Sequence, residues 1–260
     1  MSELLKRVLT ASILLPLAIW WLAFSASPWF EWIAAALGFF ACLEFILLLK
    51  LKPKSAWILL CATIFLWLAL EKSLPLIFSI SMIASVVLFL FHVEEDMAQH
   101  WQRSLMFQWL LLWVVLFIWV LIELQTFPDG RKWLFGAFIG VWLADIGAYF
   151  VGRRFGKHKL CPLVSPGKSI EGFVGGIIIS VPVVMYIWLS ELSMHWLFAL
   201  LLAVLLATVS VLGDLAESAC KRVLGTKDSS KLLPGHGGIL DRIDALIPAI
   251  AITGMLWMQL

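Results

Sequence analysis

The chain has 260 residues, of which 62% are hydrophobic and only 14% charged, and its mean hydropathy is +0.99. A soluble domain is nearer half apolar and a quarter charged, so this composition excludes an ordinary soluble globular protein. The formal net charge of +2, without a basic arm or aromatic platform, argues against nucleic-acid binding. The four cysteines form no CxxC pair and the five histidines no HExxH spacing, so neither a disulfide framework nor a zinc site is expected.

Long apolar runs recur along the whole chain, and a membrane-spanning helix needs about 20 such residues. We predict nine spans, in chain order at about Val8–Phe24, Pro28–Leu49, Trp57–Leu70, Leu74–Phe91, Leu105–Ile122, Trp133–Val151, Phe173–Leu189, Trp196–Leu212 and Ala245–Leu260. Strands would instead give short alternating segments. The expected fold class is therefore all-α, a polytopic transmembrane helical bundle of about nine spans.

Basic residues set the expected orientation, because cytoplasmic loops are enriched in Lys and Arg. With the N-terminus in the cytoplasm, only Lys72, Arg131 and Lys132 fall on the outer side. The first span follows Lys6 and Arg7 as a cleaved signal would, but a second span comes almost at once, so we expect a retained anchor.

One carboxylate, Glu44, lies well inside a predicted span of the first half of the chain. An acid buried in a membrane is a functional candidate, and a packing contact with a neighbouring helix is an equal alternative. No internal repeat is visible, so the inverted-repeat signature of many transporters is missing.

The densest polar stretch is 213–244, which lies between the last two predicted spans. It holds ten of the 36 charged residues: Asp214, Glu217, Lys221, Arg222, Lys227, Asp228, Lys231, Asp241, Arg242 and Asp244. Charges beside a membrane are costly and tend to be functional. Carboxylates next to lysines and arginines favour chemistry on a metal and a phosphate.

If the helix that begins at Trp196 continues past Leu212, then Asp214, Ser218 and Lys221 share one of its faces. Asp241 and Asp244 stand three residues apart before the last span, and the loop is long enough for Asp214 and Asp241 to meet. Two oxygen ligands completed by water and substrate phosphate suit Mg²⁺. Charge compensation at a helix N-terminus explains one of these last two acids, but not the whole array.

A second polar block, Gly152–Gly172, precedes the seventh span. Its Gly167-Lys168-Ser169 mimics the end of a Walker A loop, but Pro162 stands where that motif requires glycine. Ser165, Lys168 and Ser169 can still bind phosphate, helped by the amides of the following helix. The positive-inside rule alone explains the basic residues that open the block: Arg153, Arg154, Lys157 and Lys159.

Glycines have two expected uses. The turn Pro234–Gly238 lets backbone amides approach a ligand. His236 within it could contact phosphate, orient a carboxylate or simply lie in the loop. The GxxxG spacings of Gly136 with Gly140 and of Gly172 with Gly176 predict close helix packing.

The two polar blocks together resemble the phosphatidate cytidylyltransferases, or CDP-diacylglycerol synthases. The shared residues of the later block are Ser218-Ala219-Cys220-Lys221-Arg222, Lys227-Asp228 and His236-Gly237-Gly238-Ile239-Leu240-Asp241-Arg242-Ile243-Asp244. Those of the earlier block are Asp145, Ala148-Tyr149, Gly152-Arg153, Gly156-Lys157, Pro162, Ser165-Pro166, Lys168-Ser169 and Glu171-Gly172. The match covers roughly the C-terminal half.

The resemblance implies that CTP and phosphatidic acid give CDP-diacylglycerol and pyrophosphate. It implies a homodimer in a bacterial-type plasma membrane, with a cytoplasmic site containing Mg²⁺, and it leaves room for a second, monovalent cation. It assigns metal ligation to Asp214 and Asp241. The expected catalytic residues are Lys221, Arg222, Lys227, Asp228, His236, Arg242 and Asp244. The expected substrate-binding residues are Asp145, Tyr149, Arg153, Lys157, Ser165, Lys168, Ser169, Glu171, Ser218, Gly237 and Gly238. The regions are an N-terminal transmembrane part, 1–122, and a catalytic part, 123–260, with cytoplasmic loops 152–172 and 213–244.

Two alternatives stay open. A CTP-dependent lipid kinase uses similar residues but releases CDP. A transporter of a phosphorylated solute places its charges along a midplane pathway, whereas here they cluster at one face.

Overall fold

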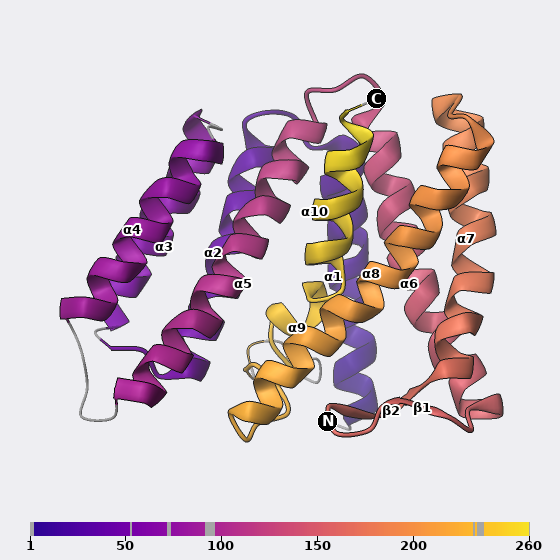
Figure 1. Ribbon diagram of the computed structural model, residues 1–260. Helices are drawn as coiled ribbons and strands as arrows, with labels where there is room; N and C mark the ends of the chain where they lie inside the picture. The colour runs from indigo at the N-terminus through magenta and orange to yellow at the C-terminus, as the bar shows by residue number, and fades with distance from the viewer. Residues whose placement is uncertain are drawn as a thin grey trace. The chain divides into compact units, whose positions relative to one another are not determined.

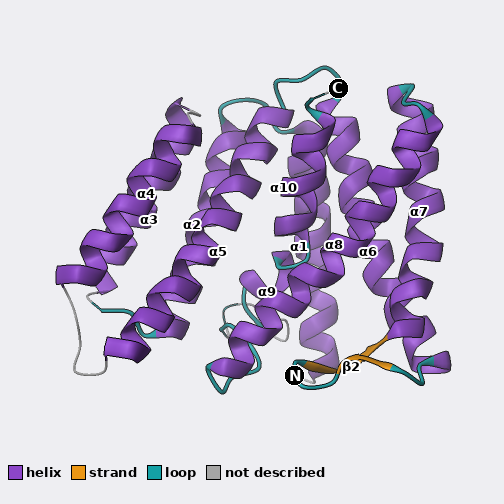
Figure 2. Cartoon of the chain, in the orientation of Figure 1, coloured by secondary structure: helices purple, strands orange, loops and turns teal. Residues whose placement is uncertain are grey.

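The computed structural model of the protein describes residues 3–52, 54–71, 74–91, 97–230, 232 and 237–259. These residues form ten α-helices and one short antiparallel β-sheet (Figures 1 and 2). The helices are α1 (Glu3–Phe24), α2 (Trp29–Leu49), α3 (Lys54–Glu71), α4 (Leu74–Phe91), α5 (Met97–Leu124), α6 (Gly130–Phe155), α7 (Ile170–Leu192), α8 (Trp196–Val223), α9 (Leu240–Ile243) and α10 (Leu246–Trp257). The strands are β1 (Lys159–Cys161) and β2 (Ser165–Ser169).

Each predicted span coincides with one helix, and α9 is an additional short one. Among the described residues, five helices are long and apolar enough to cross a membrane: α2, α5, α6, α7 and α8. The chain is therefore that of an integral membrane protein with a mostly helical fold. The count of nine spans and the cytoplasmic N-terminus stay predictions.

The chain divides into two compact units. The first comprises Met1–Glu123 and Asp228–Arg242, and the second comprises Leu124–Lys227 and Ile243–Leu260. The late polar stretch is thus shared, because Asp214 belongs to the second unit and Asp241 to the first.

In the first unit, large aromatic and aliphatic side chains fill the space between helices. Trp57 of α3 meets Phe107 of α5 edge to face, with 5.0 Å between the ring centroids, and both side chains are fully buried. Helix α2 ends where Lys50 adopts a left-handed conformation and its N–H bonds back to the carbonyls of Ile46 and Leu47. The last turns of α2, which carry Glu44, bury the side chains of Phe45, Ile46 and Leu49.

In the second unit, glycines bring α6 and α7 together. A Cβ added at Gly172 would lie 2.7 Å from the carbonyl oxygen of Ala148, and one at Gly176 would lie 2.6 Å from that of Ala144. A Cβ on Gly136 would strike the indole of Trp188. The close packing that the GxxxG spacings predict is confirmed.

The sheet lies in a loop for which no strand was predicted. β1 and β2 pair antiparallel, with Lys159 opposite Ser169 and Cys161 opposite Ser165. α7 then begins at Ile170, three residues earlier than predicted, because the Ser169 hydroxyl caps it by accepting the Gly172 N–H at 3.1 Å. The phosphate-binding candidates therefore lie on a strand and a helix cap.

α8 continues through Val223, so the predicted extension past Leu212 is confirmed. The approach to the last span differs from expectation, since Asp241 lies in the separate helix α9 and Asp244 in a turn before α10. Pro248 has no N–H to donate to the Asp244 carbonyl, which explains why α9 does not continue into α10.

Candidate active site

A cavity of about 640 Å³ lies in the second unit, between α6, the β-hairpin, α7 and α8. Seven residues selected from the sequence line it: Asp145, Tyr149, Arg153, Ser165, Lys168, Ser169 and Asp214. The earlier polar block and the first acid of the later block thus come together. Nine further lining residues were not predicted as site residues: Ala148, Gly152, Gly156, Lys159, Leu160, Gly167, Gly172, Phe173 and Val211.

The spacing on α6 explains how its residues reach this cavity. Asp145, Tyr149 and Gly152 recur every three or four positions and therefore share one face of the helix. A Cβ on Gly152 would lie 3.0 Å from the Ser169 hydroxyl, so the absent side chain lets β2 approach α6 closely. Arg153 donates to the Tyr149 hydroxyl at 3.1 Å, which holds its guanidinium beside the cavity.

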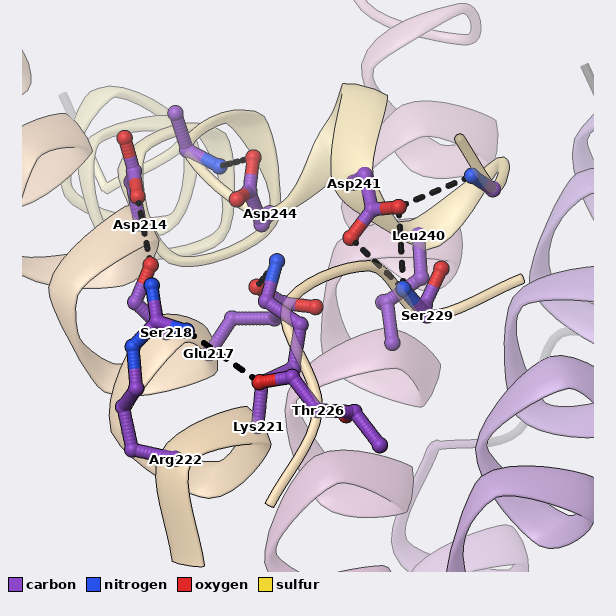
Figure 3. A network of polar contacts seen from close by, with 12 residues as sticks. Asp214, Glu217, Ser218, Lys221, Arg222, Thr226, Ser229, Leu240, Asp241 and Asp244 are labelled. Atoms are coloured by element: carbon purple, nitrogen blue, oxygen red, sulfur yellow. Dashed lines mark hydrogen bonds and ion pairs between the residues drawn. The ribbon is translucent and has the colours of Figure 1, made fainter. Parts of the chain in front are cut away.

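An ion pair joins the hairpin to α8. The Lys168 ammonium lies 2.7 Å from an oxygen of Asp214, and both side chains are only about a quarter exposed. The Ser218 hydroxyl donates to the other Asp214 oxygen at 3.2 Å, one helical turn further along (Figure 3). This bond confirms that Asp214 and Ser218 share a face of α8.

A second, more deeply buried pair lies on the same helix. Glu217 and Lys221 form an i,i+4 ion pair, with side chains 4% and 10% exposed. Breaking such a pair by removing one partner leaves a buried charge, which costs about 3–5 kcal/mol. Lys221 therefore has a packing role, whatever it contributes to chemistry.

Asp244 lies beside these acids. A Cβ on Gly213 would meet the Asp244 carbonyl oxygen at 2.6 Å, so α8 passes very close to the turn that carries Asp244. Burial raises the pKa of Asp244 well above its ordinary value, and the negative charges of Asp214 and Glu217 raise it further, against the opposing effect of Lys221. A bound cation would reduce the electrostatic repulsion between carboxylates that lie this close together.

The donor set fits the expected metal. Mg²⁺ prefers one or two carboxylate oxygens, with water and substrate phosphate completing its shell. Within one unit, Asp214 and Asp244 carry carboxylate oxygens of this kind. Among the described residues there is no group of three or more His, Cys, Asp or Glu that could hold a metal on its own.

Asp241 lies in the first unit, where its carboxylate accepts two backbone N–H groups. Ser229 donates at 3.0 Å and Gly238 at 2.8 Å to the same oxygen (Figure 3). Gly237 has a φ of 81°, which explains the need for glycine at that position. The expected pairing of Asp241 with Asp214 joins two units and stays a prediction, and His236 lies outside the described residues.

The remaining candidates are spread around these elements. Arg222 donates to the Val164 carbonyl at 3.1 Å and to the Thr226 carbonyl at 3.3 Å, which ties the end of α8 to the hairpin. Lys227, Asp228 and Arg242 are exposed.

Five predicted substrate-binding residues are not among those that line the cavity: Lys157, Glu171, Ser218, Gly237 and Gly238. The Glu171 carboxylate accepts the backbone N–H groups of Lys157 at 3.0 Å and His158 at 3.2 Å. In the structure, Glu171 therefore stabilises the turn that leads into β1.

Comparison with known proteins identifies several relatives. The sequence model described as "Cytidylyltransferase family" matches residues 5–259. A phosphatidate cytidylyltransferase of Staphylococcus saprophyticus is 46% identical over 138 residues, which cover 52% of this chain and 53% of the relative. The enzymes of that name from Staphylococcus haemolyticus and Staphylococcus aureus are 47% and 43% identical over 137 residues, 52% of each chain. The chain thus spans about half the length of the curated relatives it matches.

Proposed function

The chain belongs to the Cytidylyltransferase family, and on this premise we propose that it transfers CMP from CTP to phosphatidic acid. An oxygen of the phosphatidate phosphate attacks the α-phosphorus of CTP. The bond from that phosphorus to the oxygen bridging to the β-phosphorus breaks. The products are CDP-diacylglycerol and pyrophosphate, and no oxidant or reductant is needed.

The observation that carries the proposal is the cavity in which Lys168 and Asp214 form their ion pair. It combines ammonium and hydroxyl donors for phosphate with a carboxylate for a cation. The nucleophile is already an anion near pH 7, so the reaction needs no strong base. Its difficulty is repulsion between two anions, which positioning and charge neutralisation overcome.

The residues take roles that follow from their places. Ser165, Lys168 and Ser169 hold a substrate phosphate at the hairpin, with Arg153 beside them. Asp214 and Asp241 hold Mg²⁺, with Asp244 assisting; the crowding of negative charge around Asp244 supports this assignment.

The basic residues of the late polar stretch, namely Lys221, Arg222, Lys227 and Arg242, balance phosphate charge. A Mg²⁺ ion held by the aspartate carboxylates would neutralise charge on the CTP phosphates and on the departing pyrophosphate. Lys168 also orients Asp214 through their 2.7 Å contact.

The setting of the reaction is part of the same proposal. CTP is a cytosolic nucleotide, and the positive-inside rule assigns both polar blocks to the cytoplasmic face. We accordingly propose a plasma-membrane enzyme with a cytoplasmic site that works as a homodimer.

Purified protein in detergent tests the proposal when it is given CTP, phosphatidic acid and Mg²⁺. Pyrophosphate and lipid-linked CMP are measured together. Equal amounts of both products, lost in Asp214→Ala, support the assignment. Release of CDP with a phosphorylated lipid would replace it by a kinase, and absence of any product from folded protein would refute it.

A further inference from the structure

The least expected contact in the first unit is made by Glu44 near the end of α2. Its side chain reaches a segment almost 200 positions later in the chain and meets four donors there. One carboxylate oxygen accepts the Ser230 hydroxyl at 2.8 Å and the Ile239 N–H at 3.0 Å. The other accepts the Leu240 N–H at 2.9 Å and the Ser229 hydroxyl at 3.2 Å. The residue is 5% exposed.

These bonds connect two short segments, Ser229–Ser230 and the start of α9, to one carboxylate. Ile239 and Leu240 lie at that start. The carboxylate has acceptor positions for all four donors, and hydrogen bonds to an ionised group are roughly twice as strong as neutral ones. A Cβ at Gly238 would collide with the Glu44 carboxylate and with the Ser229 hydroxyl, so the backbone at Gly238 packs directly against this group.

Ser229 connects this anchor to Asp241. Its hydroxyl bonds to Glu44, while its N–H bonds to Asp241 at 3.0 Å. Asp241 also accepts the N–H of Gly238, the residue just before the Glu44-bound pair. The orientation of the Asp241 carboxylate is thereby coupled to Glu44 through Ser229, which bonds to both carboxylates, and through Gly238, which directly precedes the Glu44-bound Ile239.

We propose that Glu44 is a positioning residue that holds Ser229 and Ser230 beside Ile239 and Leu240 and, through Ser229, orients the Asp241 carboxylate. This inference rests on the proposed function, in which Asp241 holds Mg²⁺. From the sequence, a functional role and a packing contact are equal alternatives for Glu44. In this proposal both hold, because Glu44 makes a packing contact that orients a residue of the site.

Glu44→Gln is the sharpest test because it preserves shape. It replaces one acceptor oxygen with a donor NH₂, and each oxygen now accepts a backbone N–H, so one of those amides loses its partner. Groups that orient a metal ligand typically cost 10–100-fold in activity or metal affinity when changed. We expect kcat to fall by about 10-fold or more and the Mg²⁺ concentration for half-maximal rate to rise, with KM for CTP nearly unchanged.

Glu31→Gln is the matched control, since Glu31 lies on the same helix and is 4% exposed. Its carboxylate accepts the Ser27 hydroxyl at 2.8 Å at the opposite end of α2. A general effect of removing a buried charge from α2 would appear in both variants. Positioning of Asp241 predicts the altered Mg²⁺ dependence in Glu44→Gln alone.

Hydrogen–deuterium exchange gives a readout that needs no substrate. The amides of Ile239 and Leu240 should exchange faster in Glu44→Gln than in the wild type and in Glu31→Gln. Should Glu44→Gln fail to fold, Ser230→Ala removes one of the four bonds and is tested in the same way.

Wild-type exchange rates at Ile239 and Leu240 together with an unchanged Mg²⁺ requirement would overturn the inference. Faster exchange of the Ile239 and Leu240 amides with an unchanged Mg²⁺ dependence would contradict the claim that Glu44 orients the Asp241 carboxylate. A wild-type protein that forms no CDP-diacylglycerol would instead count against the proposed function, and the exchange data would still decide whether Glu44 holds the two segments together.

Discussion

At the scale of single residues, the ion pair between Lys168 and Asp214 is the most informative contact of the cavity. It joins a lysine from a strand to an acid from a helix, 46 positions apart in the printed sequence. Surface pairs of this kind contribute little to stability, but this one is partly enclosed and lies where phosphate and cation are expected to meet. Its main effect should therefore be on activity.

Lys168→Gln should lower kcat by about 10²-fold or more, because it removes a preorganised positive charge from the phosphate site. Lys132→Gln serves as control, since Lys132 pairs with Asp129 at 3.0 Å at the other end of α6 and is half exposed. Steady-state rates of pyrophosphate release distinguish the two variants. Equal rates in both would remove Lys168 from the site.

Asp214→Asn should raise the Mg²⁺ requirement and lower the maximal rate, because an amide oxygen is a weaker ligand for a hard cation than a carboxylate. Chelation should stop the wild-type reaction, and added Mg²⁺ should restore it. Titration of the rate with Mg²⁺ checks both statements. An Asp214→Asn protein with the wild-type titration curve would show that this carboxylate does not bind the metal.

At the scale of elements, the helices follow from the apolar pattern and the polar connections do not. Hydropathy predicts where the helices lie, because an apolar segment in lipid must pair its own backbone N–H and C=O groups, and a helix does so. It contains no signal for the β-hairpin, whose Ser165–Ser169 strand includes proline and glycine. Likewise, the break at Asp244 depends on a single proline. The cavity brings together predicted site residues that lie on helices, such as Asp145 and Asp214, whereas Lys157, in the turn after α6, is not among its lining residues.

The glycine contact between α6 and α7 carries a stability prediction. In Gly176→Ala, a Cβ would lie 2.6 Å from the backbone oxygen of Ala144, which cannot rotate away. Overpacking of this type costs about 1–3 kcal/mol, so Tm in detergent should fall. Gly167→Ala is the control, because nothing lies within 4 Å of its added Cβ. A Tm for Gly176→Ala equal to that of Gly167→Ala would contradict the close packing.

At the scale of the whole molecule, the sequence predicts an orientation that the fold does not test. Leu163, 93% exposed, lies in the hairpin after α6, and Pro128 lies in the exposed connection before it. In a variant whose native cysteines are replaced, Leu163→Cys should react with an impermeant thiol reagent from the cytoplasmic side, and Pro128→Cys from the opposite side. Labelling of sealed vesicles of both orientations measures this, and the reverse pattern would refute the predicted topology.

What the sequence could not predict at this scale is which contacts join its distant parts. The bonds from Glu44 to Ser229, Ile239 and Leu240 connect an isolated acid in an apolar run to a polar stretch nearly 200 residues later. A lone carboxylate shows that a partner is needed, because an unpaired charge is costly inside a membrane. It does not show which partner, since that depends on the tertiary fold.

The central claim is that the cytidylyl group, and not a terminal phosphate, moves to the lipid. CTP labelled at its α-phosphorus and CTP labelled at its γ-phosphorus test it in parallel reactions with phosphatidic acid. With cytidylyl transfer, the α-label should enter the lipid and the γ-label should leave in pyrophosphate. Entry of the γ-label into the lipid would contradict it and identify a kinase.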